Sequence, residues 1–357
     1  MNISLKQSNQ LKSIAILMMV CIHLFNTIEY EGLFQPIIYW GDLPIIYYIS
    51  LFCDAAVPIF SFVAGYGIYL KYKQNPQQYG LNTNLRRIKL LYKNYWVIFI
   101  LFVIILGGLL KGEAYLGSVP ELLLAFSGIT ASSYNGAAWF FTIYIIFLLL
   151  SKPIFKIVDL FPKTTFILSG ILYVIGYYFR MYHYDLFSNN VINWIYFNTC
   201  LFFATLFQIL MGVYVIKFNW KAHCSTLFDV LSQKISKNII AVLGMIGLVC
   251  LHAYIPNAIL APITGLGFVL LFVQMDIPKV IDKVLEQLNP HATNIWLTHM
   301  FFYITFFKEF IYSPKYIIPI LLLLLACTIL SSYLINFILG LKLPFSMKLP
   351  LMDKVNR

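Results

Sequence analysis

The sequence predicts an all-α protein that crosses a membrane many times. Of its 357 residues, 61% are hydrophobic and only 11% are charged, whereas about a quarter of the residues in a soluble domain are charged. Apolar runs close to the thickness of a bilayer recur along the chain. Because backbone polar groups in lipid must pair with one another, such runs are expected to be helices. We therefore predict a single domain, residues 1–357, built as a polytopic bundle of ten transmembrane helices.

Each of the ten helices is predicted from an apolar run and from the polar residues that end it. The first run has a basic start like a signal peptide, but no small-x-small cleavage site follows, so we interpret it as an uncleaved span. The spans are expected at residues 12–28, 44–70, 95–110, 137 to at least 152, 164–179, 191–216, 239–255, 258–275, 292–307 and 316–340.

The basic residues predict how the bundle is oriented. Residues 71–94 carry six Lys and Arg and no acid, whereas residues 29–43 carry three acids and no Lys or Arg. With ten spans, 21 of the 25 Lys and Arg lie on one side, and only Lys111, Arg180, Lys308 and Lys315 lie on the other. Since basic residues accumulate in cytoplasmic loops, both termini are predicted to be cytoplasmic. This distribution explains the net charge of +11 without a nucleic-acid partner.

Two polar residues stand out in the first span, KSIAILMMVCIHLF at residues 12–25. Lys12 and His23 are eleven residues apart, so a helix returns them to nearly one face, roughly 16 Å apart along its axis. An ionisable side chain inside a membrane is costly and usually faces a protein interior or a watery cavity. His23 is therefore a candidate catalytic residue; the structural alternative is a hydrogen bond to a neighbouring helix.

Two further polar residues interrupt apolar runs. His299 ends the stretch NIWLTH in the ninth span, roughly 10 Å from its start. Because the first and ninth spans run in the same direction, His299 is expected at the depth of His23, where it serves catalysis or bonds to another helix. Asp54 lies near the middle of the second span and is expected to pair with a cation, a histidine or backbone donors. It either orients His23 or has a structural role beside Pro58.

The basic segment before the third span suggests phosphate binding. Arg86, Lys89 and Lys93 follow i, i+3, i+7 spacing and share a helical face. Arginine binds phosphate through its bidentate fork, so Arg86, Arg87 and Lys89 with Lys12 are candidates for an anionic ligand. The alternative is membrane orientation and headgroup contact. The chain has no glycine-rich phosphate loop, no GxSxG and no metal-ligand spacing, so no metal is expected.

With these residues in hand, nearly the whole chain resembles the acyltransferase-3 family of integral-membrane O-acyltransferases. Five short motifs occur in the family's order on the expected spans. They are Lys12-x10-His23, where family members commonly have Arg first; Val57-Pro58-Ile59-Phe60 with Ala64-Gly65-Tyr66; Arg86-Arg87-Ile88-Lys89; Trp139-Phe140 with Pro153; and Ile295-Trp296-Leu297-Thr298-His299.

The resemblance implies transfer of an acyl group, usually acetyl, from cytoplasmic acyl-CoA to a carbohydrate hydroxyl. The acceptor would be a cell-surface polysaccharide or its lipid-linked precursor, and the protein would work in a bacterial cytoplasmic membrane, alongside polysaccharide synthesis machinery. We accordingly expect catalysis by His23, His299 and Asp54, donor binding by Lys12, Arg86, Arg87 and Lys89, and substrate binding by Trp139. The residues alone leave two alternatives: a transporter or flippase of a polysaccharide unit or small anion with a His/Asp proton relay, or an inactive scaffold.

Overall fold

The computed structural model describes residues 3–183 and 185–340, and helices dominate that part of the chain. The strands found there form one short antiparallel hairpin, β1 (Tyr39–Trp40) and β2 (Leu43–Pro44). The α-helices are α1 Leu5–Phe25, α2 Ile45–Phe52, α3 Ala56–Gln74, α4 Leu81–Ile98, α5 Gly108–Lys111, α6 Glu113–Leu116, α7 Val119–Phe126, α8 Trp139–Leu160, α9 Pro162–Tyr182, α10 Asn190–Lys217, α11 Trp220–Leu231, α12 Lys237–Tyr254, α13 Ala261–Phe272, α14 Lys279–Leu288, α15 Ala292–Met300, α16 Lys308–Tyr312 and α17 Ile317–Gly340.

The shorter helical segments join these helices or extend them. Turns of 3₁₀ helix lie at Cys53–Ala55, Ala131–Ser133, Gly136–Ala138, Ala258–Leu260 and Asn289–His291. Two segments are π-helical: Phe99–Gly107 extends α4, and Phe301–Phe306 extends α15.

Seven helical segments of the described chain are long and apolar enough to cross a membrane, so the protein is an all-α polytopic membrane bundle. The predicted spans at residues 164–179, 258–275 and 292–307 coincide with α9, α13 and α15, which are outside that set of seven. The count of ten spans and the cytoplasmic termini therefore stay predictions. The predicted cytoplasmic tail, 341–357, lies outside the described residues. The seven segments are Leu5–Phe25, Ile45–Gln74, Leu81–Lys111, Gly136–Leu160, Asn190–Lys217, Lys237–Tyr254 and Ile317–Gly340.

The second predicted span is not one continuous α-helix, because the turn Cys53–Ala55 separates α2 from α3. Pro58 is the third residue of α3, where its missing N–H is tolerated since the first helical N–H groups have no partner inside the helix. In an unbroken helix its ring would clash with the carbonyl four residues earlier, which belongs to Asp54. Pro58 thus explains why the turn that carries Asp54 departs from α-helical geometry.

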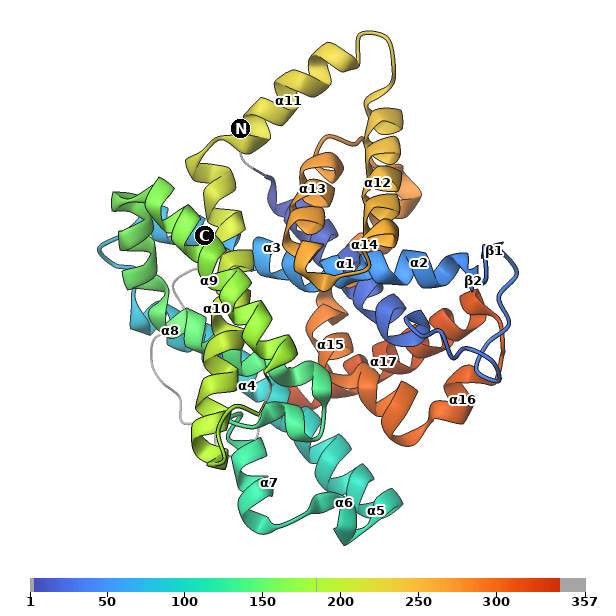
Figure 1. The fold of residues 1–357 in the computed structure, drawn as a ribbon. Coiled ribbons are helices and arrows are strands. Elements are labelled where there is room, and N and C mark those ends of the chain that lie inside the picture. The colour runs from blue at the N-terminus through green and yellow to red at the C-terminus, as the bar shows by residue number, and fades with distance from the viewer. Residues whose placement is uncertain (1–2, 184, 341–357) are drawn as a thin grey trace.

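Two glycines bring α3 and α10 into backbone contact. A Cβ atom on Gly212 would lie 2.2 Å from the Phe62 carbonyl oxygen, and one on Gly65 would lie 1.9 Å from the Ile209 carbonyl oxygen. Small residues permit such close approach between membrane helices. Figure 1 shows that α10 also runs alongside α9. Helix α3 therefore packs against a helix that is itself packed against α9.

Several helices differ from the sequence-based expectation. The helix that was predicted to start at residue 95 begins at Leu81, and the helices that were not predicted are α6, α7, α11, α14 and α16. Helix α14 binds the first half of α1: the Ser13 hydroxyl donates to the Leu285 carbonyl at 2.6 Å, and the Gln10 amide donates to Asp282 at 2.7 Å. These contacts fix the part of α1 that carries Lys12.

Candidate active site

Helices α1 and α15 bring His23 and His299 together. The centroids of the two imidazole rings are 4.9 Å apart, and the ring planes are inclined by 39°. His299 is fully buried, whereas His23 is partly exposed. The two histidines thus form a pair of which only His23 is accessible.

The backbone of α15 determines which nitrogen of His299 carries hydrogen. Its Nδ1 atom lies 2.9 Å from the Trp296 carbonyl oxygen and 3.1 Å from the Ile295 carbonyl oxygen. Carbonyl oxygens can only accept, so Nδ1 must donate. The Nε2 atom of a neutral His299 therefore has a free lone pair, and it is buried with no hydrogen-bond partner in the described chain.

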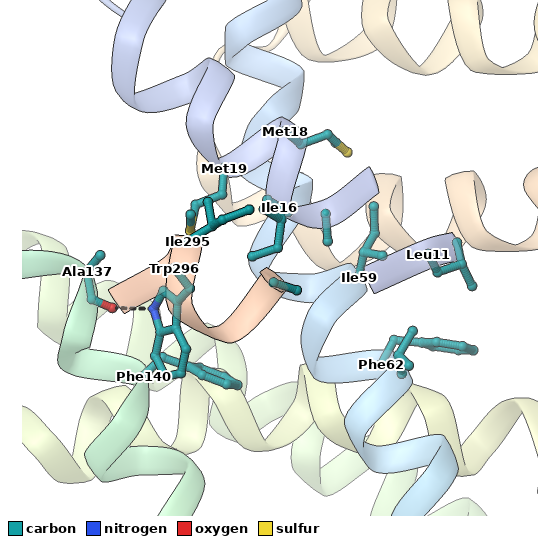
Figure 2. Packing of buried hydrophobic residues seen from close by; sticks show 14 of the residues in the cluster. Leu11, Ile16, Met18, Met19, Ile59, Phe62, Ala137, Phe140, Ile295 and Trp296 are labelled. Atoms are coloured by element: carbon teal, nitrogen blue, oxygen red, sulfur yellow. Dashed lines mark hydrogen bonds between the residues drawn. The ribbon is translucent and has the colours of Figure 1, made fainter. Parts of the chain in front are cut away.

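Polar contacts at Asn294 and Trp296 anchor α15. The Asn294 amide donates to Ser332 on α17 at 2.8 Å and accepts from Asn94 on α4 at 2.7 Å. The Trp296 indole donates to the Ala137 carbonyl at 2.8 Å, as Figure 2 shows. In a membrane, such interhelical hydrogen bonds fix how a helix is rotated. They hold the face of α15 that carries His299 toward α1.

Tyr303 is a site residue that sequence reasoning missed. Its hydroxyl oxygen lies 3.3 Å from Nδ1 of His23, and its ring is parallel to that of His299 with a centroid distance of 6.0 Å. It belongs to the π-helical segment Phe301–Phe306, a geometry that occurs frequently at functional sites. The one signal in the sequence was its position four residues after His299, on the same helix face.

Two basic side chains from separate helices line one large cavity. Lys12 of α1 and Arg87 of α4 both face this basic cavity, which has a volume of about 450 Å³. Tyr144, Asn289 and Thr293 add polar groups, and no Asp or Glu among the described residues lines it. Because no described carboxylate in the lining neutralises the two cations, the cavity is suited to an anionic ligand.

A smaller central cavity adjoins the basic cavity and reaches His23. It has a volume of about 60 Å³, and Phe60, Phe140 and Trp296 line both spaces. Trp139, predicted to bind substrate, lines the central cavity, and the Arg180 guanidinium lies 5.3 Å above its ring. Lys12 and His23 therefore line two neighbouring cavities that share aromatic wall residues.

A third cavity, the outer cavity, also borders His23. Its volume is about 200 Å³, and its walls include Asn26, Thr27, Tyr303 and Lys308. His23 lines both this cavity and the central one. Among the predicted site residues, His23 is therefore the one that the outer and central cavities share.

The remaining predicted site residues, Asp54, Arg86 and Lys89, do not line these cavities. Asp54 is 3.7 Å from Nε2 of His252, and no hydrogen bond joins it to His23 in the described structure. Arg86 and Lys89 lie on α4 with exposed side chains and line none of these three cavities. Of the four predicted donor-binding residues, the fold brings Lys12 and Arg87 together.

Comparison with known proteins identifies the family. Residues 5–337 match the model of the acyltransferase-3 family, which is described as an acyltransferase domain. No curated protein and no solved structure matches the chain. The family match includes α1, α4 and α15, which carry Lys12, Arg87 and His299. Since the match extends over nearly the whole chain, this protein belongs to the acyltransferase-3 family and is a membrane acyltransferase.

Proposed function

We propose that the protein transfers an acetyl group from cytoplasmic acyl-CoA to a hydroxyl of a cell-surface polysaccharide or its lipid-linked precursor. The observation that supports this proposal is that His23 lines both the outer cavity and the central cavity, and that the central cavity shares lining residues with the basic cavity. A donor and an acceptor can then reach the same imidazole from different cavities.

The basic cavity is proposed as the donor site. Its volume of about 450 Å³ lies within the range of ligand pockets, and Lys12 and Arg87 supply charges for phosphate groups. Arg86 and Lys89, exposed on the same helix, would extend the positive surface at its mouth. The central cavity has space for roughly four water-sized groups, which suits the three heavy atoms of an acetyl group better than a long acyl chain.

His23 is proposed as the residue that carries the chemistry. As a general base, it takes the proton of the acceptor hydroxyl while the oxygen attacks the thioester carbonyl carbon; the carbon–sulfur bond then breaks, and the proton passes to the CoA thiolate. The alternative is transient transfer of the acyl group to the imidazole. When His23 takes the proton, its imidazole becomes positively charged. His299 and Asp54 are proposed to stabilise this positive charge. Asp54 would act from the neighbouring turn and without a direct hydrogen bond.

The outer cavity is proposed as the acceptor site. Amide, hydroxyl and ammonium groups from Asn26, Thr27 and Lys308 line it. Such groups bind the many hydroxyls of a carbohydrate, and Trp139 offers an aromatic face nearby in the central cavity. We further propose that the protein works in a bacterial cytoplasmic membrane. There, a protein of the polysaccharide synthesis machinery would deliver the polymer to it.

The test is acetyl transfer by the purified protein in lipid nanodiscs. Labelled acetyl-CoA is incubated with surface polysaccharide from cells that lack the protein, and mass spectrometry locates the ester. His23→Ala should reduce transfer by on the order of a hundredfold or more, as loss of acid–base assistance does. His183→Ala is the matched control, because His183 is an exposed histidine whose ring contacts Tyr178 and Phe179 and lines none of the three cavities.

Two outcomes would contradict the proposal. Normal transfer by a well-expressed His23→Ala protein would remove His23 from the chemistry. Flux of glycan or protons through proteoliposomes, with no ester formed from acetyl-CoA, would favour the transporter alternative.

A further inference from the structure

We propose that Tyr303 is a positioning residue that accepts a hydrogen bond from Nδ1–H of His23 and so leaves Nε2 as the nitrogen that takes the proton of the acceptor hydroxyl. The inference rests on the proposed function, because it assumes that His23 acts as the base. It adds to the site a residue that neither the family motifs nor the sequence pattern assigned.

The first support is that Tyr303 is the hydrogen-bond partner of His23. Its hydroxyl oxygen lies 3.3 Å from Nδ1, and no other hydrogen bond to the His23 ring occurs in the described chain. Tyr303 is 8% exposed, so packing restrains the side chain. A base needs a third group that orients it, and Tyr303 is located where such a group must be.

The second support is that His299 makes no hydrogen bond to His23 in the described structure. Its hydrogen is on Nδ1, where two backbone carbonyls accept it. Its Nε2 atom has a lone pair that could accept, but this atom is buried with no hydrogen-bond partner in the described chain. The tyrosine hydroxyl differs, because it lies 3.3 Å from Nδ1 of His23 and can accept from Nδ1–H.

The direction of the bond between Tyr303 and His23 follows from the chemistry. If the hydroxyl donated to Nδ1, the hydrogen of neutral His23 would be on Nε2, and both ring nitrogens would be occupied. If Nδ1–H donates to the hydroxyl oxygen, Nε2 has a lone pair for the hydrogen of the acceptor O–H. The Nδ1–H bond stays intact during the transfer, so the ring keeps its orientation until the proton passes on to the CoA thiolate.

The kinetic test compares Tyr303→Phe with Tyr95→Phe in the full-length protein. Tyr95 is a matched control because it is another buried tyrosine, and its hydroxyl donates to the Ala125 carbonyl at 2.6 Å, away from all three cavities described above. With acetyl-CoA and the polysaccharide acceptor, Tyr303→Phe should lower kcat about tenfold and change the KM for acetyl-CoA less than about twofold. Tyr95→Phe should leave both constants unchanged.

The second test reads the hydrogen position directly and does not require turnover. Histidine labelled with nitrogen-15 is incorporated into the wild-type protein, and the His23 signals are assigned by their loss in His23→Gln. We expect hydrogen on Nδ1 of His23 in the wild type and a shift toward Nε2 in Tyr303→Phe.

The outcomes separate this inference from the proposed function. Hydrogen on Nε2 of His23 in the wild type, or wild-type kcat together with an unchanged tautomer in Tyr303→Phe, would overturn the role of Tyr303. If the wild type transfers no acetyl group, the proposed function fails, while the nitrogen-15 spectrum of the wild type still decides whether Tyr303 holds Nδ1. If Tyr303→Phe does not fold, the spectrum of the wild type alone still decides whether hydrogen is on Nδ1 of His23.

Discussion

Lys12 and Arg87 line the same cavity although they belong to α1 and α4, and no carboxylate from residues 3–183 or 185–340 lines it with them. Arg86, the neighbour of Arg87, has an exposed side chain that does not line the cavity. Adjacent arginines on one helix thus have different surroundings, because consecutive helical residues point about 100° apart.

This difference predicts unequal effects of two single substitutions. Arg87→Gln should raise the KM for acetyl-CoA about tenfold or more, as loss of a charge-assisted hydrogen bond does. Arg86→Gln should raise it less, and its effect should fade as salt screens the exposed charge. Lys163→Gln is the control, since Lys163 is exposed at the start of α9. Equal effects of Arg86→Gln and Arg87→Gln would favour membrane orientation as their shared role.

His299→Gln should lower kcat about tenfold or more and leave the thermal midpoint of unfolding near that of the wild type. Glutamine retains hydrogen-bonding groups but cannot replace the imidazole beside His23. His291→Gln is a suitable control, because His291 is also buried near the start of α15 and bonds to Ser332 at 2.8 Å. Normal turnover in His299→Gln would mean that this histidine is structural.

Gly212→Ala should destabilise the protein by about 1–3 kcal/mol, the usual range for overpacking. The added methyl group would lie 2.2 Å from the Phe62 carbonyl oxygen, so α3 and α10 would have to separate. Gly247→Ala is the matched control: the position lies within α12, and a Cβ atom there meets nothing within 4 Å. It should stabilise α12 by up to about 1 kcal/mol. Thermal unfolding in detergent checks both, and a stable Gly212→Ala protein would contradict the tight contact.

Acid should weaken the contact between α14 and α1. Hydrogen bonds from Lys6 and Gln10 hold the pKa of the Asp282 carboxyl below its ordinary range. Since the pKa is lower in the folded state, this stabilisation is present above the unfolded pKa of about 3.9 and is lost as the pH falls through the folded value. Asp282→Asn should therefore lower the thermal midpoint at neutral pH, and the difference from the wild type should shrink below about pH 4.

The control for Asp282 is Asp42→Asn. Asp42 is an exposed carboxylate that has no ion pair in the described residues. Its substitution should change the thermal midpoint little at any pH. A difference between Asp282→Asn and the wild type that stays constant down to low pH would show that the carboxylate charge does not hold α14 to α1.

The sequence by itself determined the membrane bundle and predicted the main polar residues of the candidate site. Long apolar runs must be helical in lipid, so hydropathy predicted the helices directly. Lys12, His23, Arg87 and His299 were predicted because an ionisable group in or beside an apolar run is exceptional, and the family's short motifs contain the same positions.

The tertiary structure alone decided which of these residues meet. Tyr303 is one of 25 tyrosines, and its position four residues after His299 did not mark it as a partner of His23 until α1 placed the two side by side. Asp54 lies next to His252 because α12 packs on that side of the broken helix, whereas the sequence analysis named His23 as the residue that Asp54 could orient. Hydropathy records only that a residue is buried. Which neighbour it meets depends on helix rotation and packing between segments far apart in the chain.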